Sequence, residues 1–240
     1  MKKLLLASAV ALFGLSNAQI AKGTTYVSGQ VGFSQANDNN EDKKVSEINI
    51  IPTVGYFVNT NLAIGLGVGY KHNKTQKDTY SSVAVPNPLG GNITTINEGN
   101  TKNIDNSIVV EPFIRKYWTL GEKLYFFGQL SVPMEFGSGK EELNGKTTVI
   151  TDANPTNPAS TVVTSNSTSS DKAKFNSFGV SIKPGLDYFL NKNWTIEATI
   201  GEFGYNTRKY DYEGAKSQDN FNFGVNLSSV TLGVKYVFGK

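Results

Sequence analysis

The sequence contains no cysteine and a single histidine among its 240 residues. Disulfide bonds, thiol catalysis, iron–sulfur clusters and Cys-ligated zinc are therefore excluded. A lipoprotein is excluded as well, because its acyl chain needs a cysteine. We predict no cofactor and no metal site. An exported protein of this kind must obtain its stability from packing and pairing alone.

Long apolar runs are also absent, except near the N-terminus, where residues 4–15 are apolar and follow two lysines. A transmembrane helix needs about 18 or more apolar residues, and this run is shorter. The small residues Ser16 and Ala18 then mark a cleavage site, so the segment has the pattern of a secretory signal. We predict a signal peptide over residues 1–18 and one exported domain over residues 19–240.

An excess of charge of one sign is lacking too. Removing the two lysines of the predicted signal from the 23 basic residues leaves 21, against 20 acidic residues. This balance provides no electrostatic footprint for nucleic acid, so no nucleic-acid partner is expected.

What the sequence does contain is a period-two alternation of apolar and polar residues. Such alternation is typical of strands whose two faces meet different surroundings. One run places Ile108, Val110 and Ile114 on one face, with Glu111 and Arg115 on the other. Eight runs occur, at about 24–33, 45–58, 62–74, 104–118, 124–137, 174–190, 194–209 and 221–238.

The lengths of the runs and of their connections favour a membrane barrel over a soluble sandwich. Soluble strands most often have about 5 to 6 residues, whereas membrane strands need about 9 to 11. Tight turns alternate with longer polar segments, which we predict as loops at 34–44, 75–103, 138–173 and 210–220, with a mobile part near 147–170. Short periplasmic turns alternating with long extracellular loops are typical of outer-membrane barrels. We predict an all-β, antiparallel, up-and-down transmembrane barrel of eight strands, closed because unpaired backbone groups are costly in lipid.

Aromatic residues gather at the strand ends beside the short turns. Amphipathic rings at one level form a belt at the membrane interface. The predicted girdle consists of Tyr56, Tyr117, Trp118, Tyr125, Phe126, Tyr188, Trp194, Tyr236 and Phe238.

The export signal, the eight runs and the last run, which ends at Phe238, resemble the small outer-membrane β-barrel family, related to the outer membrane protein A barrel and to outer membrane protein X. The resemblance implies residence in the outer membrane. It also implies recognition of the last strand by the barrel-assembly machinery, although Gly239 and Lys240 follow Phe238 here.

The inward face predicts an ion-pair network, because an eight-stranded barrel is only just wide enough for side chains to fill it. A filled lumen of mixed charge favours a plug over a conducting path. The predicted members are Glu47, Lys71, Glu111, Arg115, Glu135, Lys183, Asp187, Glu197 and Lys235.

A second candidate site lies on the outward face near the upper strand ends. Cations there could bind lipopolysaccharide phosphates, or they could be ordinary interfacial lysines. The predicted rim consists of Lys44, Lys74, Lys102, Lys140, Lys174 and Arg208.

Three functions remain open from the sequence. The first is a structural or surface-interaction barrel that contacts outer-membrane lipid, lipopolysaccharide and an unknown extracellular partner. The second is a narrow channel or a carrier of small hydrophobic molecules, like the outer membrane protein W group. The third is a lipid-modifying enzyme using His72 and Ser46, but Lys74 stands where lipid A deacylases carry their serine. We therefore predict a non-enzymatic protein with no catalytic residues.

Overall fold

The computed structural model describes residues 20–224 and 230–238, so the predicted signal peptide and its cleavage site lie outside the described residues. Every regular element described is a strand. The elements are β1 (Thr25–Asp38), β2 (Lys43–Asn59), β3 (Leu62–Pro86), β4 (Asn92–Thr119), β5 (Leu124–Ser131), β6 (Met134–Thr151), β7 (Thr161–Phe189), β8 (Trp194–Ile200), β9 (Glu202–Tyr210), β10 (Gln218–Gly224) and β11 (Val230–Phe238). No helix in this part of the chain is long and apolar enough to cross a membrane.

The eleven elements form a closed antiparallel barrel of eight strands, as predicted. Three barrel strands are each divided into two elements, namely β5 with β6, β8 with β9, and β10 with β11. The ring closes where β1 pairs with β11, from Thr25 opposite Phe238 to Gly32 opposite Thr231. Over the height of this pairing the ring has no open edge, which is what a sheet surrounded by hydrocarbon requires.

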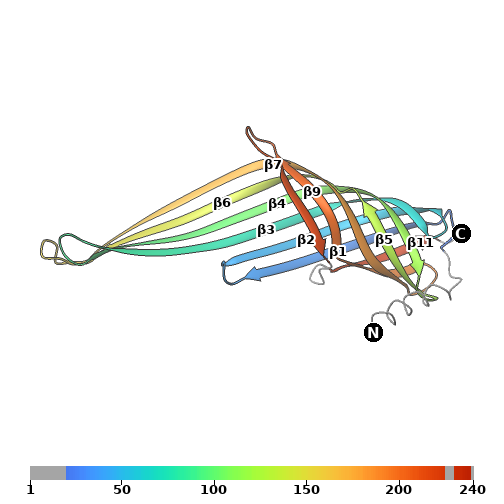
Figure 1. Ribbon diagram of the computed structural model, residues 1–240, viewed down its shortest axis with the longest axis horizontal. Helices are drawn as coiled ribbons and strands as arrows, with labels where there is room; N and C mark the ends of the chain where they lie inside the picture. The colour runs from blue at the N-terminus through green and yellow to red at the C-terminus, as the bar shows by residue number, and fades with distance from the viewer. Residues whose placement is uncertain (1–19, 225–229, 239–240) are drawn as a thin grey trace.

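Four strands continue far beyond the ring as a protruding sheet, which extends to the left in Figure 1. We define it as residues 78–86 of β3, 92–100 of β4, 144–151 of β6 and 161–174 of β7. Beyond these limits β2 has stopped pairing with β3, at Lys77, and β9 has stopped pairing with β7, at Phe175. The barrel wall is therefore much taller on one side than on the other.

The predicted loops at 34–44, 75–103 and 138–173 are wrong, because strand pairing continues through most of these segments. Their polarity does not prevent pairing, since neighbouring backbones in a sheet bond to each other without needing an apolar face. Threonine and valine are frequent at the tips, and β-branched residues favour extended backbone. Only the turns at the ends of the hairpins, such as 152–160, remain irregular.

A one-residue offset divides β8 from β9. Gly185 pairs with Thr199, whereas Ile182 pairs with Phe203, so β9 has one more residue than continuous pairing would give. The extra residue is Gly201, whose φ of 85° is a backbone conformation that glycine adopts without strain. Because strand side chains alternate, this bulge exchanges the inward and outward faces for all of β9.

Candidate functional site: the lumen network and the basic belt

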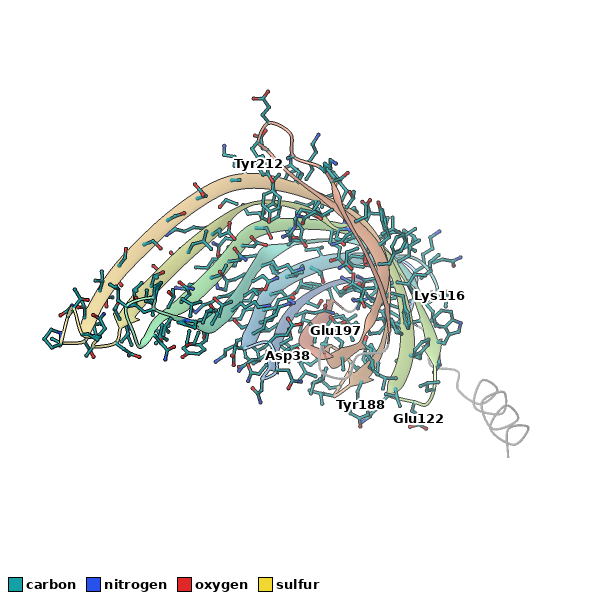
Figure 2. All side chains as sticks on the ribbon, turned by 60° about the vertical axis from the view of Figure 1, so that its left-hand side comes forward. Asp38, Lys116, Glu122, Tyr188, Glu197 and Tyr212 are labelled. Atoms are coloured by element: carbon teal, nitrogen blue, oxygen red, sulfur yellow. The ribbon has the colours of Figure 1, made fainter. Side chains whose placement is uncertain are left out.

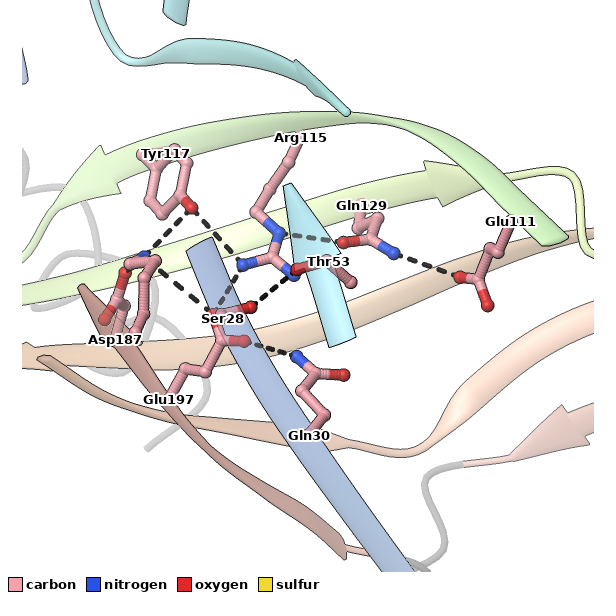
Figure 3. A network of polar contacts seen from close by, with 10 residues as sticks. Ser28, Gln30, Thr53, Glu111, Arg115, Tyr117, Gln129, Asp187 and Glu197 are labelled. Carbon is pink, nitrogen blue, oxygen red and sulfur yellow. Dashed lines mark hydrogen bonds and ion pairs between the residues drawn. The ribbon is translucent and has the colours of Figure 1, made fainter. Parts of the chain in front are cut away.

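The part of the lumen nearer the short turns contains a fully buried network of charged side chains, which Figure 3 shows from close by. The Arg115 guanidinium donates from Nη1 to Glu197 Oε2 over 2.6 Å and from Nε to Gln129 Oε1 over 2.8 Å. Lys235 pairs with Asp187 and lies 3.8 Å from Glu197. All four charged side chains are at most 1% exposed. Two cations thus face two carboxylates, and the network is neutral.

This arrangement follows from the register. Asp187 on β7 is directly opposite Glu197 on β8, and two like charges in that position repel. Lys235 on β11 reaches both carboxylates from the other side of β8, and Arg115 reaches Glu197 across the lumen from β4. Gln30 donates a further hydrogen bond of 2.6 Å to Glu197. Residues far apart in the sequence therefore satisfy one another at the centre.

A second group of ion pairs lies in the lumen further from the short turns. Glu111 accepts from Lys183 over 2.7 Å, and Lys71 lies 3.5 Å from Glu47 and 3.2 Å from Glu135. These groups line a polar cavity of about 330 Å³ that also reaches Glu202. The structure thus brings all nine predicted inward residues into ion pairs. Glu202 escaped the sequence reasoning because the bulge at Gly201 reverses its face.

An aromatic cluster fills the end of the lumen beside the short turns, and the prediction that Tyr117 and Tyr125 belong to a lipid-facing girdle is wrong. Tyr117 is 1% exposed and Tyr125 is 5% exposed. They pack with Tyr26, Phe57 and Phe127. Their position in the alternation, one residue out of phase with Trp118 and Phe126, is the signal that could have identified them as inward.

The outward face carries a ring of lysines above the apolar part of the barrel wall. On each strand these lysines are separated by an even number of residues from exposed apolar side chains. The lysines therefore lie on the same outer face of the sheet. We call this set the basic belt: Lys44, Lys74, Lys102, Lys140, Lys172, Lys174 and Lys209. Five of the six predicted rim residues belong to it, and Lys172 and Lys209 are additions that the sequence reasoning missed.

Arg208 does not belong to the belt, so its prediction as an outward rim residue is wrong. Its guanidinium lies in the lumen, 2.6 Å from Asp105 and 3.6 Å from Glu135, and 4.2 Å over the Phe175 ring. The cause is again the bulge at Gly201, which turns the even residues of β9 inward and brings Lys209 to the outer face.

Within the described part of the belt's rows on β2 to β9, Glu142 is the one acidic side chain. It lies 2.7 Å from Lys140 and 3.4 Å from Lys102. The hydrogen bond from Lys140 and the contact with Lys102 hold the pKa of Glu142 below its ordinary value, so it stays ionised. Lys140 is also directly opposite Lys172, and such like-charged neighbours are unfavourable without an anion between them.

A family model described as "Outer membrane protein beta-barrel domain" matches residues 4–238. The chain belongs to this family. As an outer-membrane β-barrel it resides in the outer membrane, and its exposed apolar side chains face lipid. No curated protein sequence matches the chain significantly.

Solved structures of small outer-membrane barrels are similar to this family member over most of its length. The N-terminal β-barrel domain of OprF from Pseudomonas aeruginosa is 11% identical, covers 91% of this chain and 100% of its own, and has a TM-score of 0.33. Ail, the attachment invasion locus protein of Yersinia pestis, is 15% identical, with coverages of 90% and 99% and a TM-score of 0.32. Outer membrane protein W of E. coli is 13% identical, with coverages of 91% and 99% and a TM-score of 0.36.

The remaining predicted girdle residues of this outer-membrane barrel face outward. Trp118 packs on Phe126 with ring centroids 5.5 Å apart, and Tyr236 packs between Trp194 and Phe238, 5.0 Å from each. Tyr56 and Tyr188 are exposed on the same face, and Figure 2 shows Tyr188 at this end of the barrel. Rings at the level of the short turns fit an interfacial belt.

His72 has a different neighbour from the one that an enzyme would require. Its Nδ1 lies 2.8 Å from Asn106 Oδ1, which also accepts from the Tyr70 hydroxyl over 2.6 Å. Ser46 is directly opposite Lys74 rather than His72. No described group of three or more His, Asp or Glu side chains could hold a metal ion. The geometry around His72 is that of a polar cross-strand contact.

Proposed function

We propose that this protein is a non-conducting, non-enzymatic outer-membrane barrel that binds lipopolysaccharide through the basic belt and presents the protruding sheet as an interaction surface. It is exported by the signal at residues 1–18 and assembled through β11. The proposal rests on a difference between the cations on the inward face and those on the outward face of the barrel. The inward cations named above each have a carboxylate partner, whereas Lys172, Lys174 and Lys209 have none among the described residues.

The lumen supports the non-conducting part of the proposal. Arg115, Glu197 and Lys235 meet at the centre, and the aromatic cluster lies below them. Ionisable side chains inside a membrane protein either pair with one another or line a pathway, and the pairing of these charges favours a plug. A structural role for these residues also explains why they are distributed over β4, β7, β8 and β11.

We expect the refolded protein to give no discrete current steps in a planar bilayer. Folded insertion is verified by the faster migration of the unheated barrel on a detergent gel. Reproducible steps from inserted protein would contradict the plug and would favour the channel or carrier function instead.

The position of the belt supports lipopolysaccharide as the ligand. The lysines border the apolar outer surface, and the phosphates of a lipid lie at the border of its apolar layer. Replacing Lys140, Lys172, Lys174 and Lys209 with Gln should weaken binding to lipopolysaccharide vesicles about tenfold or more, since each interfacial lysine contributes on the order of 1 kcal/mol. Surface plasmon resonance at two salt concentrations measures this, and high salt should reduce the difference.

The matched control replaces four lysines near the periplasmic end, Lys22, Lys116, Lys123 and Lys192, with Gln. This removes the same charge, so it should change the affinity less than about twofold if position rather than net charge matters. Vesicles of dephosphorylated lipid A test whether phosphate is recognised. Equal losses in both variants, or undiminished binding without phosphate, would contradict the assignment.

A further inference from the structure

A shallow trench of about 560 Å³ crosses the protruding sheet, apart from the lumen network and the basic belt. One side of the trench is the row of cross-strand partners that runs from Asp78 on β3 to Thr168 on β7. The other side is the row from Tyr80 to Asn166, two residues further from the ring on each strand. These rows cross β3, β4, β6 and β7, which lie side by side in Figure 1. At about 4.8 Å between neighbouring strands, the trench is roughly 15 Å long.

The trench opens on the outer face of the sheet, the face that also carries the basic belt. On β4, Asn100 is two residues from Lys102, and on β6, Asn144 is four residues from Lys140. Side chains an even number of residues apart lie on the same face of a strand. At about 3.3 Å per residue, the trench begins roughly 7 Å beyond Lys102, on the side away from the apolar part of the barrel. Along the outer face, the apolar surface is therefore followed by the belt and then by the trench.

The side chains in the trench offer hydrogen-bonding groups and one aromatic ring. Asn144, Asn166 and Thr168 form no side-chain hydrogen bond with another described residue. Amides and hydroxyls both donate and accept, which matches the hydroxyl groups of a sugar. Tyr80 is 67% exposed at the end of one row, and its ring provides a flat apolar surface for the C–H groups of a sugar ring. These groups together have the chemistry of a saccharide site.

The charges of the trench disfavour a phosphorylated or sulfated ligand. Glu98 is paired with Lys146 over 2.8 Å, but Asp42 and Asp78 have no ion pair with a described residue. Their carboxylates leave the trench negatively charged, and this charge repels phosphate and sulfate groups. A carboxylate nevertheless accepts strong hydrogen bonds from neutral donors, as Asp78 does from the side-chain amide of Asn100. The lining therefore fits a sugar without charged groups.

We propose that the trench binds uncharged sugars in the core saccharide of the same lipopolysaccharide molecule whose phosphates the basic belt binds. The inference rests on the proposed function and adds a saccharide site to it. In lipopolysaccharide, acyl chains, phosphates and core sugars follow one another outward from the membrane. The apolar surface, the belt and the trench follow one another in the same order. A lipid that is bound through its phosphates therefore brings its sugars to the trench at a high effective concentration.

The first test measures binding of the intact, refolded protein to two kinds of vesicle by surface plasmon resonance. One kind contains lipopolysaccharide with its core saccharide, and the other contains lipid A, which has phosphates but lacks the core sugars. The parent should bind the first kind about tenfold more tightly. This preference should persist at high salt, because contacts with uncharged sugars are not screened. Equal binding of the two vesicles, or a preference that high salt removes, would overturn the proposal.

The second test uses the double variant Tyr80→Ala with Asn144→Ala, which removes the exposed ring and one amide from the trench. It should bind lipid A vesicles within about twofold of the parent and lose the preference for the core saccharide. The matched control is Val83→Ala with Asn97→Ala, at odd positions of β3 and β4 that face away from the trench. The control should keep the preference, and the detergent gel verifies folding of both variants. Equal losses of preference would overturn the assignment.

Two further comparisons separate the source of the sugar and the function on which this inference rests. Maltotriose and lactose, as free uncharged sugars, are tested by saturation-transfer NMR. Binding of these sugars that requires Tyr80 and Asn144, with equal binding of the two vesicles, would overturn the lipopolysaccharide source and assign an external glycan. A belt variant that binds lipid A like the parent, while the trench variant loses its preference, would count against the belt and leave the trench standing. The reverse result would overturn the trench alone.

Discussion

Replacing Glu197 with Gln should lower the free energy of unfolding by about 3 to 5 kcal/mol, because breaking a buried ion pair leaves a charge without compensation. Glu197 is fully buried and accepts from Arg115 over 2.6 Å and from Gln30 over 2.6 Å. Without that charge, Asp187 is the carboxylate left in this network, and it pairs with Lys235 rather than with Arg115. Urea unfolding in lipid vesicles, followed by tryptophan fluorescence, measures the loss.

The matched control is Glu98→Gln on the protruding sheet. Glu98 pairs with Lys146 over 2.8 Å, but the two side chains are 48% and 51% exposed. Exposed pairs contribute only about 0 to 1 kcal/mol, so this variant should unfold almost like the parent. Adding Arg115→Gln to Glu197→Gln should recover part of the loss, since the uncompensated cation is then removed. A loss below about 1 kcal/mol for Glu197→Gln would contradict a stabilising plug.

The second large effect is expected at Gly55, because a Cβ atom there would lie 2.2 Å from Cζ of the Tyr26 ring. Tyr26 is fully buried in the aromatic cluster, where its ring packs against Phe57 with ring centroids 5.7 Å apart. Gly55→Ala should therefore cost about 1 to 3 kcal/mol, the usual range for overpacking a core. The same urea titration reports it.

A double-mutant cycle with Tyr26→Leu tests the physical reason. The three nearest atoms to the added Cβ all belong to the Tyr26 ring, so the double variant should be less destabilised than the sum of the single variants. Gly29→Ala on β1 is the control, because nothing lies within 4 Å of its added Cβ. Additive effects at Gly55 and Tyr26 would mean that the strand, rather than the ring, resists the substitution.

The sequence predicted much of the barrel because lipid imposes simple conditions on each strand separately. Alternation along a strand decides which residues meet hydrocarbon, so Ile108 and Ile114 were placed outward and Glu111 and Arg115 inward. The tight turn at Asn61, with its φ of 58°, and the turns at 119–124 and 189–194 are likewise local features. Local rules therefore determined the strand number, the antiparallel order and nine of the inward charges, but not Glu202 or Arg208.

Features that depend on neighbouring strands required the tertiary structure. The bulge at Gly201 could have been suspected, because the apolar positions change from Ile200 to Phe203 and Tyr205, but only pairing with β7 shows that it turns Arg208 inward and Lys209 outward. Strand ends at the protruding sheet depend on whether a neighbour continues alongside, which local polarity does not reveal.

By itself, the sequence determined that this chain forms an eight-stranded barrel with charged residues inside and apolar residues outside. Only the tertiary structure decided which charges meet, how tall each side of the wall is and which backbone groups stay open. The physical reason is that side-chain alternation is a property of one strand, whereas register, bulges and unpaired edges are properties of adjacent strands. The Asp187–Glu197–Lys235 contact and the two rows that border the trench both arise from such adjacency.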